Sequence, residues 1–378
     1  MEQTILNARG RYEELTELLR EKQIRKVLLV AGNFVSATPI GAFFEQLPGK
    51  AGIGVVRFRS FEPNPRYESV VEGVRVFRQE CCEAIVAVGG GSAMDVAKCI
   101  KLFSNMDEGK RYLEQPIVPN DIPLIAVPTT AGTGSEATRY SIIYDGGEKQ
   151  TITDDSAVPD YVLFDASFLE TLPLYHKRAT MMDALCHSTE SFWSVNSTPQ
   201  SRAFSRQAIE MIFSAKDSYL AGEKSGHEQM LMASNIAGKA INISQTTAGH
   251  AMSYKLTSLY GLAHGHAVAV CIPAIWEYMI DHTDRCADAR GQAYLEAVFE
   301  QLAEAYGCRE PRQAPERFRA LLNELELTAP AVTDEELEVL AKSVNPTRLK
   351  NNPVPLSQAD LKELYSRILG VKDGNQSI

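Results

Sequence analysis

The stretch EAIVAVGGGSAMDVAK, residues 83–98, indicates the fold of the first half of this 378-residue chain. Its apolar, partly β-branched run predicts a buried strand that ends near Val88, and a helix is expected to start near Ala93. The three glycines and Ser92 between them allow a tight turn, and the N–H groups at the start of a helix favour an anion. A pyrophosphate would fit there, although a plain tight turn would explain the same glycines.

Other short apolar runs alternate with helical segments through the same half of the chain. These runs are KVLLVAG (26–32), GIGVVRF (52–58), PLIAVPTT (123–130), YSIIYD (140–145) and YVLFD (161–165). Strands separated by helices predict right-handed crossovers and a largely parallel sheet. Such a sheet binds ligands at the carboxyl ends of its strands. We therefore expect a dinucleotide-binding α/β domain over residues 1–172.

The strand pattern stops after about residue 170, and helical patterns continue to the C-terminus. The boundary is expected near Leu172–Pro173, which leaves a helical domain over residues 173–378. The predicted fold class is therefore an α/β domain followed by an all-α domain.

The composition favours a small-molecule ligand. The formal charge is -10, whereas nucleic acid and anionic membranes select basic surfaces.

Seven cysteines are an odd number and lack the C-x-x-C spacing of a thiolate metal site or redox pair, so reduced thiols are expected. The charged, amphipathic N-terminal segment does not resemble a signal peptide, and no run has the roughly 20 apolar residues of a membrane span. A cytoplasmic location is expected.

A second loop, PTTAGTGSEATR (128–139), follows another buried strand and is rich in glycine and small hydroxyl residues. Two such loops at the strand ends of one sheet could hold a dinucleotide between them. The alternative is a polar surface loop.

Histidines and one carboxylate suggest a metal site in the second half. Asp183 and His187 are four residues apart in a helical segment, so they share one face. His250 and His264 lie in a histidine-rich stretch further on, and His266 is an alternative ligand. Three histidines and a carboxylate suit Fe(II) or Zn(II) with a position open for substrate oxygen. For any single histidine, a hydrogen-bonded core position is the simpler explanation. The remaining histidines, His176, His227 and His282, are expected at the surface.

Together these motifs resemble the iron-containing (group III) alcohol dehydrogenase family over most of the chain. GGGSAMDVAK resembles its dinucleotide loop, PTTAGTGSE its nicotinamide-side loop, FEPNP (61–65) its N-terminal signature and DALCH (183–187) its first metal pair. The resemblance implies a dehydroquinate synthase-like fold, with a Rossmann-like parallel-sheet domain before a helical domain. It also implies reversible hydride transfer between a nicotinamide cofactor, NADPH or NADH, and an alcohol or aldehyde. A homodimer is expected by the same analogy alone.

The resemblance also implies roles for individual residues. Fe(II), with Zn(II) as the alternative, would be held by Asp183, His187, His250 and His264. The cofactor would be bound by Gly32, Gly90, Gly91, Ser92, Asp95, Thr129, Thr130, Thr133, Ser135 and Lys149. A solvated hairpin lysine is the alternative for Lys149.

Two positions depart from the family pattern. Gly32 stands where the family often carries an aspartate that binds the adenosine ribose. We therefore expect NADPH to be accepted, and a preference for NADPH over NADH stays open. Alternatively, Gly32 only shapes a turn.

Tyr254 stands where many members carry a histidine assigned to proton relay. Its phenol could donate a proton, although a pKa near 10 makes it a poorer shuttle, and a relay through water or ribose hydroxyls is equally possible.

The substrate is expected to be a small anionic aldehyde. Arg139, Lys255 and Arg348 are cations that the resemblance brings to the active-site side, and they suit a phosphonate or carboxylate. Each of them is explained equally well as a solvated surface charge. The segment NISQTTAGHAMSYKLTSLYGLAHGHAVA (242–269) most resembles the phosphonoacetaldehyde reductase branch, which makes 2-hydroxyethylphosphonate.

Three alternatives stay open. A reductase of carboxylate semialdehydes such as succinic semialdehyde, or of aldehydes in general, would use the same residues. A dehydroquinate-synthase-like lyase shares the fold, the metal and the cofactor, but recycles its NAD. A binding protein without catalysis is the least consistent with four intact ligand positions.

Overall fold

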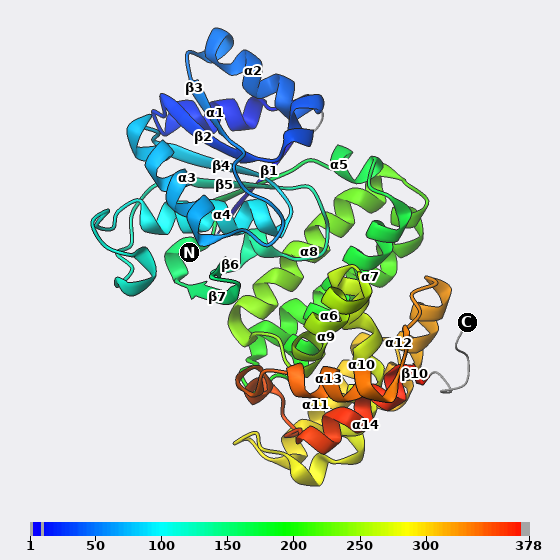
Figure 1. Ribbon diagram of the computed structural model, residues 1–378. Helices are drawn as coiled ribbons and strands as arrows, with labels where there is room; N and C mark the ends of the chain where they lie inside the picture. Colours follow the sequence, from blue (N-terminus) through cyan, green and yellow to red (C-terminus); the bar gives the residue numbers. More distant parts are fainter. Residues whose placement is uncertain (1–2, 9–10, 372–378) are drawn as a thin grey trace, which may run out of the picture. The chain divides into compact units, whose positions relative to one another are not determined.

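The computed structural model describes residues 3–8 and 11–371, and it consists of two compact units, Met1–Thr171 and Leu172–Ile378 (Figure 1). The division lies one residue from the boundary expected from the sequence. Matching the predicted fold class, the first unit contains a parallel sheet and the second is helical. In the described part of the chain, no helix is both long and apolar enough to cross a membrane.

The first unit is built on a six-stranded sheet with the order β1-β8-β5-β4-β2-β3, and every neighbouring pair is parallel. Its strands are β1 (Thr4–Asn7), β2 (Lys26–Ala31), β3 (Gly54–Phe58), β4 (Ala84–Gly89), β5 (Leu124–Pro128) and β8 (Tyr161–Phe164). The chain passes from β2 to β3 at one edge and then returns to β4 on the other side of β2. The strand order therefore reverses between β2 and β4, which is where open α/β sheets bind ligands.

Helices cover both faces of this sheet (Figure 1). They are α1 (Glu13–Glu21), α2 (Pro39–Ala51), α3 (Tyr67–Gln79), α4 (Gly91–Phe103) and the short α5 (Ser167–Glu170). Leu15 of α1 and Phe44 of α2 pack in one core with alternate strand residues such as Val86. Side chains alternate between the faces of a strand, so the intervening residues, such as Ile85 and Ala87, point to the α3–α4 side.

Two strand predictions need correction. Residues 140–145 do form a strand, β6 (Tyr140–Asp145), but it pairs antiparallel with β7 (Glu148–Thr153) in a separate two-stranded sheet. The physical reason is the turn between them, where Gly146 and Gly147 have φ values of 57° and 87°. Two consecutive positive φ angles give a tight hairpin rather than a crossover. Strand β1 was not predicted, and it adds a parallel edge beside β8.

The second unit contains nine helices among the residues described. They are α6 (Leu174–Trp193), α7 (Pro199–Leu220), α8 (Lys224–Ser244), α9 (Ala248–Tyr260), α10 (His264–Asp281), α11 (Gln292–Ala305), α12 (Gln313–Glu324), α13 (Asp334–Ser343) and α14 (Gln358–Ile368). A short parallel pair, β9 (Ala331–Val332) with β10 (Gly370–Val371), is the exception to the all-helical prediction.

Helix α6 is the central helix of this unit, packed against α7, α8, α10 and α11 (Figure 1). Every residue from Met181 to Trp193 is buried. A helix that is buried on all sides is normally apolar, so the polar residues within this segment require partners.

The prediction that His227 lies at the surface is wrong, because helix packing buries this residue. It is fully buried on α8, where Lys177 Nζ lies 3.1 Å from its Nε2 atom.

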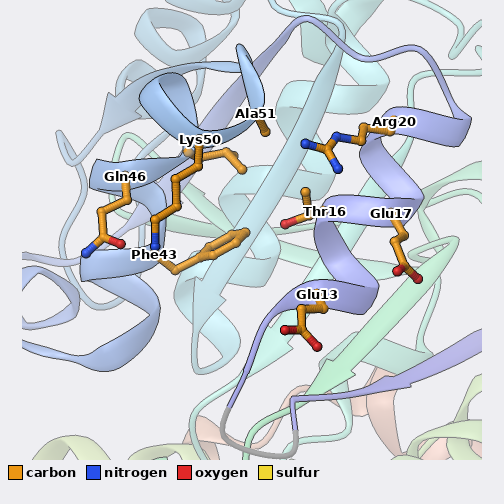
Figure 2. A pocket seen from close by; sticks show the side chains of 9 residues that line it. Glu13, Thr16, Glu17, Arg20, Phe43, Gln46, Lys50 and Ala51 are labelled. Carbon is orange, nitrogen blue, oxygen red and sulfur yellow. The ribbon is translucent and has the colours of Figure 1, made fainter.

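A surface groove of about 200 Å³ lies between α1 and α2 (Figure 2). Figure 2 shows charged and polar side chains from both helices at its rim, among them Glu17, Arg20 and Lys50, with the Phe43 ring between the helices. None of the nine residues that line it was predicted as a site residue. None of its lining residues belongs to the site described below.

Candidate functional site

The four predicted metal ligands lie together within the second unit. Asp183 and His187 are one turn apart on α6, His250 is in the first turn of α9, and His264 begins α10. The Oδ1 atom of Asp183 lies 3.7 Å from His250 Nε2, 3.9 Å from His264 Nε2 and 4.0 Å from His187 Nε2. One carboxylate oxygen thus faces three imidazole nitrogens from three helices.

The donor atoms of this cluster fit a divalent metal ion. Asp183 Oδ1 and His250 Nε2 are buried and have no hydrogen-bond partner, a costly arrangement that a cation would relieve. A tetrahedral ion with bonds of about 2.1 Å places its ligand atoms about 3.4 Å apart. The distances from Asp183 Oδ1 are about 0.3–0.6 Å larger, and the donors of Asp183, His187 and His250 all lie within 4.8 Å of one another. His264 lies outside this group of three, so its ring would have to move inward to become the fourth ligand. Imidazole and carboxylate ligands suit Fe(II) or Zn(II).

Electrostatics in the cluster favour a cation as well. Burial alone would raise the pKa of Asp183, but His187, His264 and His250 lower it well below its usual range. Burial alone would lower the pKa of His250, but the carboxylates of Glu190 and Asp183 raise it to about 9. A metal ion that binds here therefore displaces a proton from His250 at neutral pH.

Glu190 is a site residue that the sequence reasoning missed. Its fully buried carboxylate contacts His250 Nδ1 through Oε2. Its Oε1 accepts hydrogen bonds from the backbone N–H and the hydroxyl of Thr247, at 3.0 and 2.8 Å. A carboxylate on the far nitrogen of a metal-binding histidine fixes the tautomer and the ring orientation. The sequence does carry a signal, because Glu190 follows His187 by three residues and so lies on the same face of α6.

Gly265 allows α10 to approach α6 closely. A Cβ atom at this position would lie 2.1 Å from the backbone oxygen of Ala179 and 2.6 Å from the Cβ of Asp183. Because Gly265 directly follows His264, this close approach brings the fourth histidine to the carboxylate.

His266, the alternative ligand, is held elsewhere. Its Nδ1 lies 3.1 Å from the hydroxyl of Tyr175, and its Nε2 lies 3.0 Å from the backbone oxygen of Thr328. Both ring nitrogens thus have partners outside the cluster, and the geometry favours His264 as the ligand.

Tyr254 connects the metal cluster to one of the predicted cations. Its ring stacks against His264, with centroids 6.0 Å apart and planes 16° apart. Arg348 Nη1 donates to the Tyr254 hydroxyl at 3.0 Å, and the guanidinium lies 4.9 Å from the centre of the Tyr254 ring. Lys255, the next residue on α9, is partly exposed.

The predicted nucleotide loops are neighbours in the first unit. The Thr129 N–H donates to the Gly89 carbonyl at 3.1 Å. A Cβ atom on Gly90 would lie 3.6 Å from Thr130 Oγ1, and one on Gly91 would lie 3.8 Å from Thr133 Cγ2. Side chains here would fill the space between the loops, directly before the first turn of α4 that contains Ser92. This space suits a pyrophosphate, which backbone N–H groups at a helix start can bind.

A lysine that the sequence reasoning missed forms hydrogen bonds to several polar groups behind these loops. The buried Lys98 ammonium donates to Ser135 Oγ at 3.2 Å, Thr138 Oγ1 at 3.1 Å and the Tyr140 carbonyl at 2.8 Å. Burial raises the pKa of Asp95 to about 7, against the opposing charges of Lys98 and Lys149. A carboxyl group that is about half protonated at pH 7 repels a nearby phosphate less than a fully ionised carboxylate would.

The last two predicted site residues also lie in the first unit. Gly32 directly follows β2, so it stands at the reversal of strand order. Arg139 is already engaged there: Nη1 pairs with Asp155 Oδ1 at 3.0 Å, and the guanidinium lies 5.6 Å from the centre of the Tyr140 ring. Its charge is thus largely compensated within its own unit.

Comparisons with known proteins agree with this geometry. Family models described as iron-containing alcohol dehydrogenase and as the C-terminal region of the Fe-containing alcohol dehydrogenase family match residues 3–166 and 177–369. The chain is 32% identical to the NAD-dependent methanol dehydrogenase of Bacillus methanolicus over 290 residues, covering 74% of this chain and 75% of that protein. It is 35% identical to the 1,3-propanediol dehydrogenase of Citrobacter freundii over 274 residues, covering 70% of each.

Among solved structures, the chain is similar to the sulfoacetaldehyde reductase of Bifidobacterium kashiwanohense in complex with NAD+. The TM-score is 0.84 at 26% identity, and the match covers 97% of this chain and 96% of that one.

The contact between Glu190 and His250 predicts a role for Glu190 in metal affinity. Glu190→Gln keeps the shape of the side chain but removes the charge that holds His250 Nδ1, so the affinity for Fe(II) or Zn(II) should fall by about ten-fold or more. Competition against a chromophoric chelator measures this. Glu210→Gln, at an exposed position on α7, is the matched control. Equal affinities for wild type and Glu190→Gln would contradict the assignment.

The close approach at Gly265 predicts that a single methyl group disturbs the site. Gly265→Ala should lower the free energy of unfolding by about 2 kcal/mol or more and reduce the bound metal, because the backbone of α6 is in the way. Thermal unfolding and metal analysis test both effects. In Gly49→Ala, the control, the new Cβ meets nothing within 4 Å. Normal stability and metal content in Gly265→Ala would refute this packing argument.

Proposed function

The chain belongs to the iron-containing alcohol dehydrogenase family, and we propose that it catalyses the metal-dependent, NAD(P)H-linked reduction of a small anionic aldehyde to its alcohol. The first candidate substrate is phosphonoacetaldehyde, with 2-hydroxyethylphosphonate as the product. The coarser activity, oxidoreduction of alcohols and aldehydes, follows from the family.

The main observation in support of an anionic substrate is the chain of contacts from Arg348 through Tyr254 to His264. Arg348 donates to the Tyr254 hydroxyl, and the Tyr254 ring stacks on the His264 ring. A guanidinium therefore lies one side chain away from a metal ligand within the same unit. Its planar group of donors matches the oxygens of a phosphonate or carboxylate. Arg348 is accordingly better supported than Lys255 or Arg139.

The similarity to sulfoacetaldehyde reductase supports the same substrate class. The name of that protein denotes a two-carbon aldehyde with an anionic group, which has the same general layout as phosphonoacetaldehyde. The similarities to methanol and 1,3-propanediol dehydrogenases favour a second candidate, a reductase of short uncharged aldehydes.

In the proposed reaction, Asp183, His187, His250 and His264 would hold a metal ion, which when bound would supply Lewis-acid polarisation of the aldehyde oxygen, and the loops of the first unit would hold the NAD(P)H that supplies the hydride. Glu190 keeps the Nδ1 proton of His250 directed away from the site, which leaves Nε2 as the ligand atom.

Tyr254 is the residue placed to hold a proton near the reacting oxygen. Its hydroxyl accepts a hydrogen bond from Arg348 Nη1 and carries a proton of its own. We propose that Tyr254 Oη donates the proton that completes the alcohol.

The proposal predicts a marked substrate preference. With NADPH and Fe(II)-loaded enzyme, kcat/KM for phosphonoacetaldehyde should exceed that for propanal by about ten-fold or more, because a phosphonate gains charge-assisted hydrogen bonds. Succinic semialdehyde in the same assay distinguishes a carboxylate from a phosphonate preference. Comparable values for propanal and both anionic aldehydes would identify a general aldehyde reductase.

Substitution of Arg348 tests whether its guanidinium binds the anionic group of the substrate. Arg348→Ala should raise KM for phosphonoacetaldehyde by about ten-fold or more and change KM for propanal by less than about two-fold. Lys350→Ala removes an exposed charge two residues away in the same short helix and serves as the control. If Arg348→Ala impaired both substrates equally, Arg348 would act through Tyr254 rather than on the anion.

A further inference from the structure

A shallow surface hollow lies in the first unit at the carboxyl ends of β2 and β3. It is too shallow to enclose a water molecule, so a ligand would bind over it and not inside it. It is lined by Leu29, Ala31, Gly32, Val35, Ser36, Arg57 and Arg59. Two of these residues are arginines, in a chain whose net charge is -10. A local excess of positive charge in an acidic protein calls for an explanation.

The two guanidinium groups converge on one hydroxyl oxygen. Ser36 Oγ lies 2.8 Å from Arg59 Nη2 and 3.1 Å from Arg57 Nη1. Arg59 Nη1 also donates to the side-chain oxygen of Asn33 at 3.4 Å. Two like charges held on a single neutral hydroxyl repel each other unless an anion is shared between them.

The carboxylates in the surroundings compensate one of the two arginines. Glu45 Oε1 lies 3.2 Å from Arg57 Nη2. Arg59 forms no salt bridge with any residue in the described ranges 3–8 and 11–371, and its side chain is exposed. Arg57 thus holds Ser36 in place, whereas Arg59 retains an uncompensated charge toward the hollow.

The hollow lies beside the predicted pyrophosphate site. Strand β2 pairs with β4 up to Ala31 opposite Val88, so Gly32 comes next to Gly89. Neighbouring strands are about 4.8 Å apart. A nucleotide whose phosphates lie at Gly90 and Gly91 would therefore have its adenosine ribose near the end of β2.

Gly32 leaves this place open to an anion. Folds that bind NAD put an acidic residue near the ribose hydroxyls, where its charge repels a 2′-phosphate. A Cβ atom on Gly32 would lie 3.2 Å from the ring of Phe34, which is 53% exposed. Glycine thus brings neither a negative charge nor a side chain into the hollow.

We propose that this hollow binds the 2′-phosphate of NADP(H), with Arg59 as the main ligand supported by Arg57 and Ser36, so that the protein prefers NADPH to NADH. This inference rests on the proposed function, since it concerns the cofactor of that reaction. It assigns the preference to specific side chains, whereas Gly32 alone accounts only for the absence of repulsion.

Binding without aldehyde tests the proposal independently of catalysis. The metal-loaded full-length protein is titrated with NADPH and NADH by nucleotide fluorescence, and with adenosine 2′,5′-bisphosphate and 5′-AMP by calorimetry. The wild type should bind NADPH and the bisphosphate about ten-fold or more tightly than NADH and 5′-AMP. Arg59→Ala should remove most of that difference by weakening the 2′-phosphorylated ligands, with NADH affinity changed less than about two-fold.

Two further variants complete the design. Gly32→Asp should reverse the preference, because its carboxylate repels the phosphate and can accept hydrogen bonds from ribose hydroxyls. The exposed Phe34 ring can move aside, so the variant is expected to fold. Arg75→Ala, which removes an exposed arginine on α3 outside the hollow, should leave all four affinities unchanged.

Three results would overturn the inference. They are equal wild-type affinities for NADPH and NADH, an equal loss of both in Arg59→Ala, and no effect of Arg59→Ala on NADPH. None of these bears on whether an anionic aldehyde is reduced. Conversely, a tight, Arg59-dependent NADPH complex that does not reduce phosphonoacetaldehyde would refute the substrate proposal and leave the phosphate site intact.

Discussion

The second unit depends on one buried carboxylate oxygen that lacks a partner. Asp183 Oδ1 lies on the fully buried segment of α6 and faces imidazole nitrogens from α6, α9 and α10 at 3.7–4.0 Å. A buried carboxylate oxygen without a hydrogen bond is costly, and the imidazoles that face it from three helices form a site suited to a cation. Glu190 and Gly265 serve the same end, since one holds His250 and the other lets α10 approach α6.

The first unit has the features that the phosphate groups of a dinucleotide require, which are space between the loops and nearby positive charge. Gly90 and Gly91 keep side chains out of the gap between the loops after β4 and β5, and Lys98 of α4 donates hydrogen bonds to Ser135 and Thr138 of the second loop. The reversal of strand order places the end of β2 next to these loops. A candidate metal site in the second unit and a candidate dinucleotide site in the first supply the two components that reversible hydride transfer requires.

Local patterns in the sequence predicted most of this, and the failures come from contacts between distant residues. The apolar runs of β2, β4 and β5 and the spacing of Asp183 and His187 are local signals: the runs form the expected strands, and the two residues lie one turn apart on α6. Strand β1 has four residues and exists through pairing with β8, more than 150 residues away. Glu190, Lys98 and His227 resemble ordinary surface residues of helices until tertiary packing buries them. A polar residue in a helix reveals its role only once its neighbours are known.

Metal content is the most direct test of the central claim that the Asp183 cluster holds one divalent ion. Protein reconstituted with Fe(II) or Zn(II) and freed of excess metal is analysed by inductively coupled plasma mass spectrometry, as wild type, Asp183→Asn and the exposed control Asp217→Asn. The account predicts about one ion per chain in wild type and control, and a small fraction of that in Asp183→Asn. Full occupancy in Asp183→Asn, or no bound metal in the wild type, would contradict it.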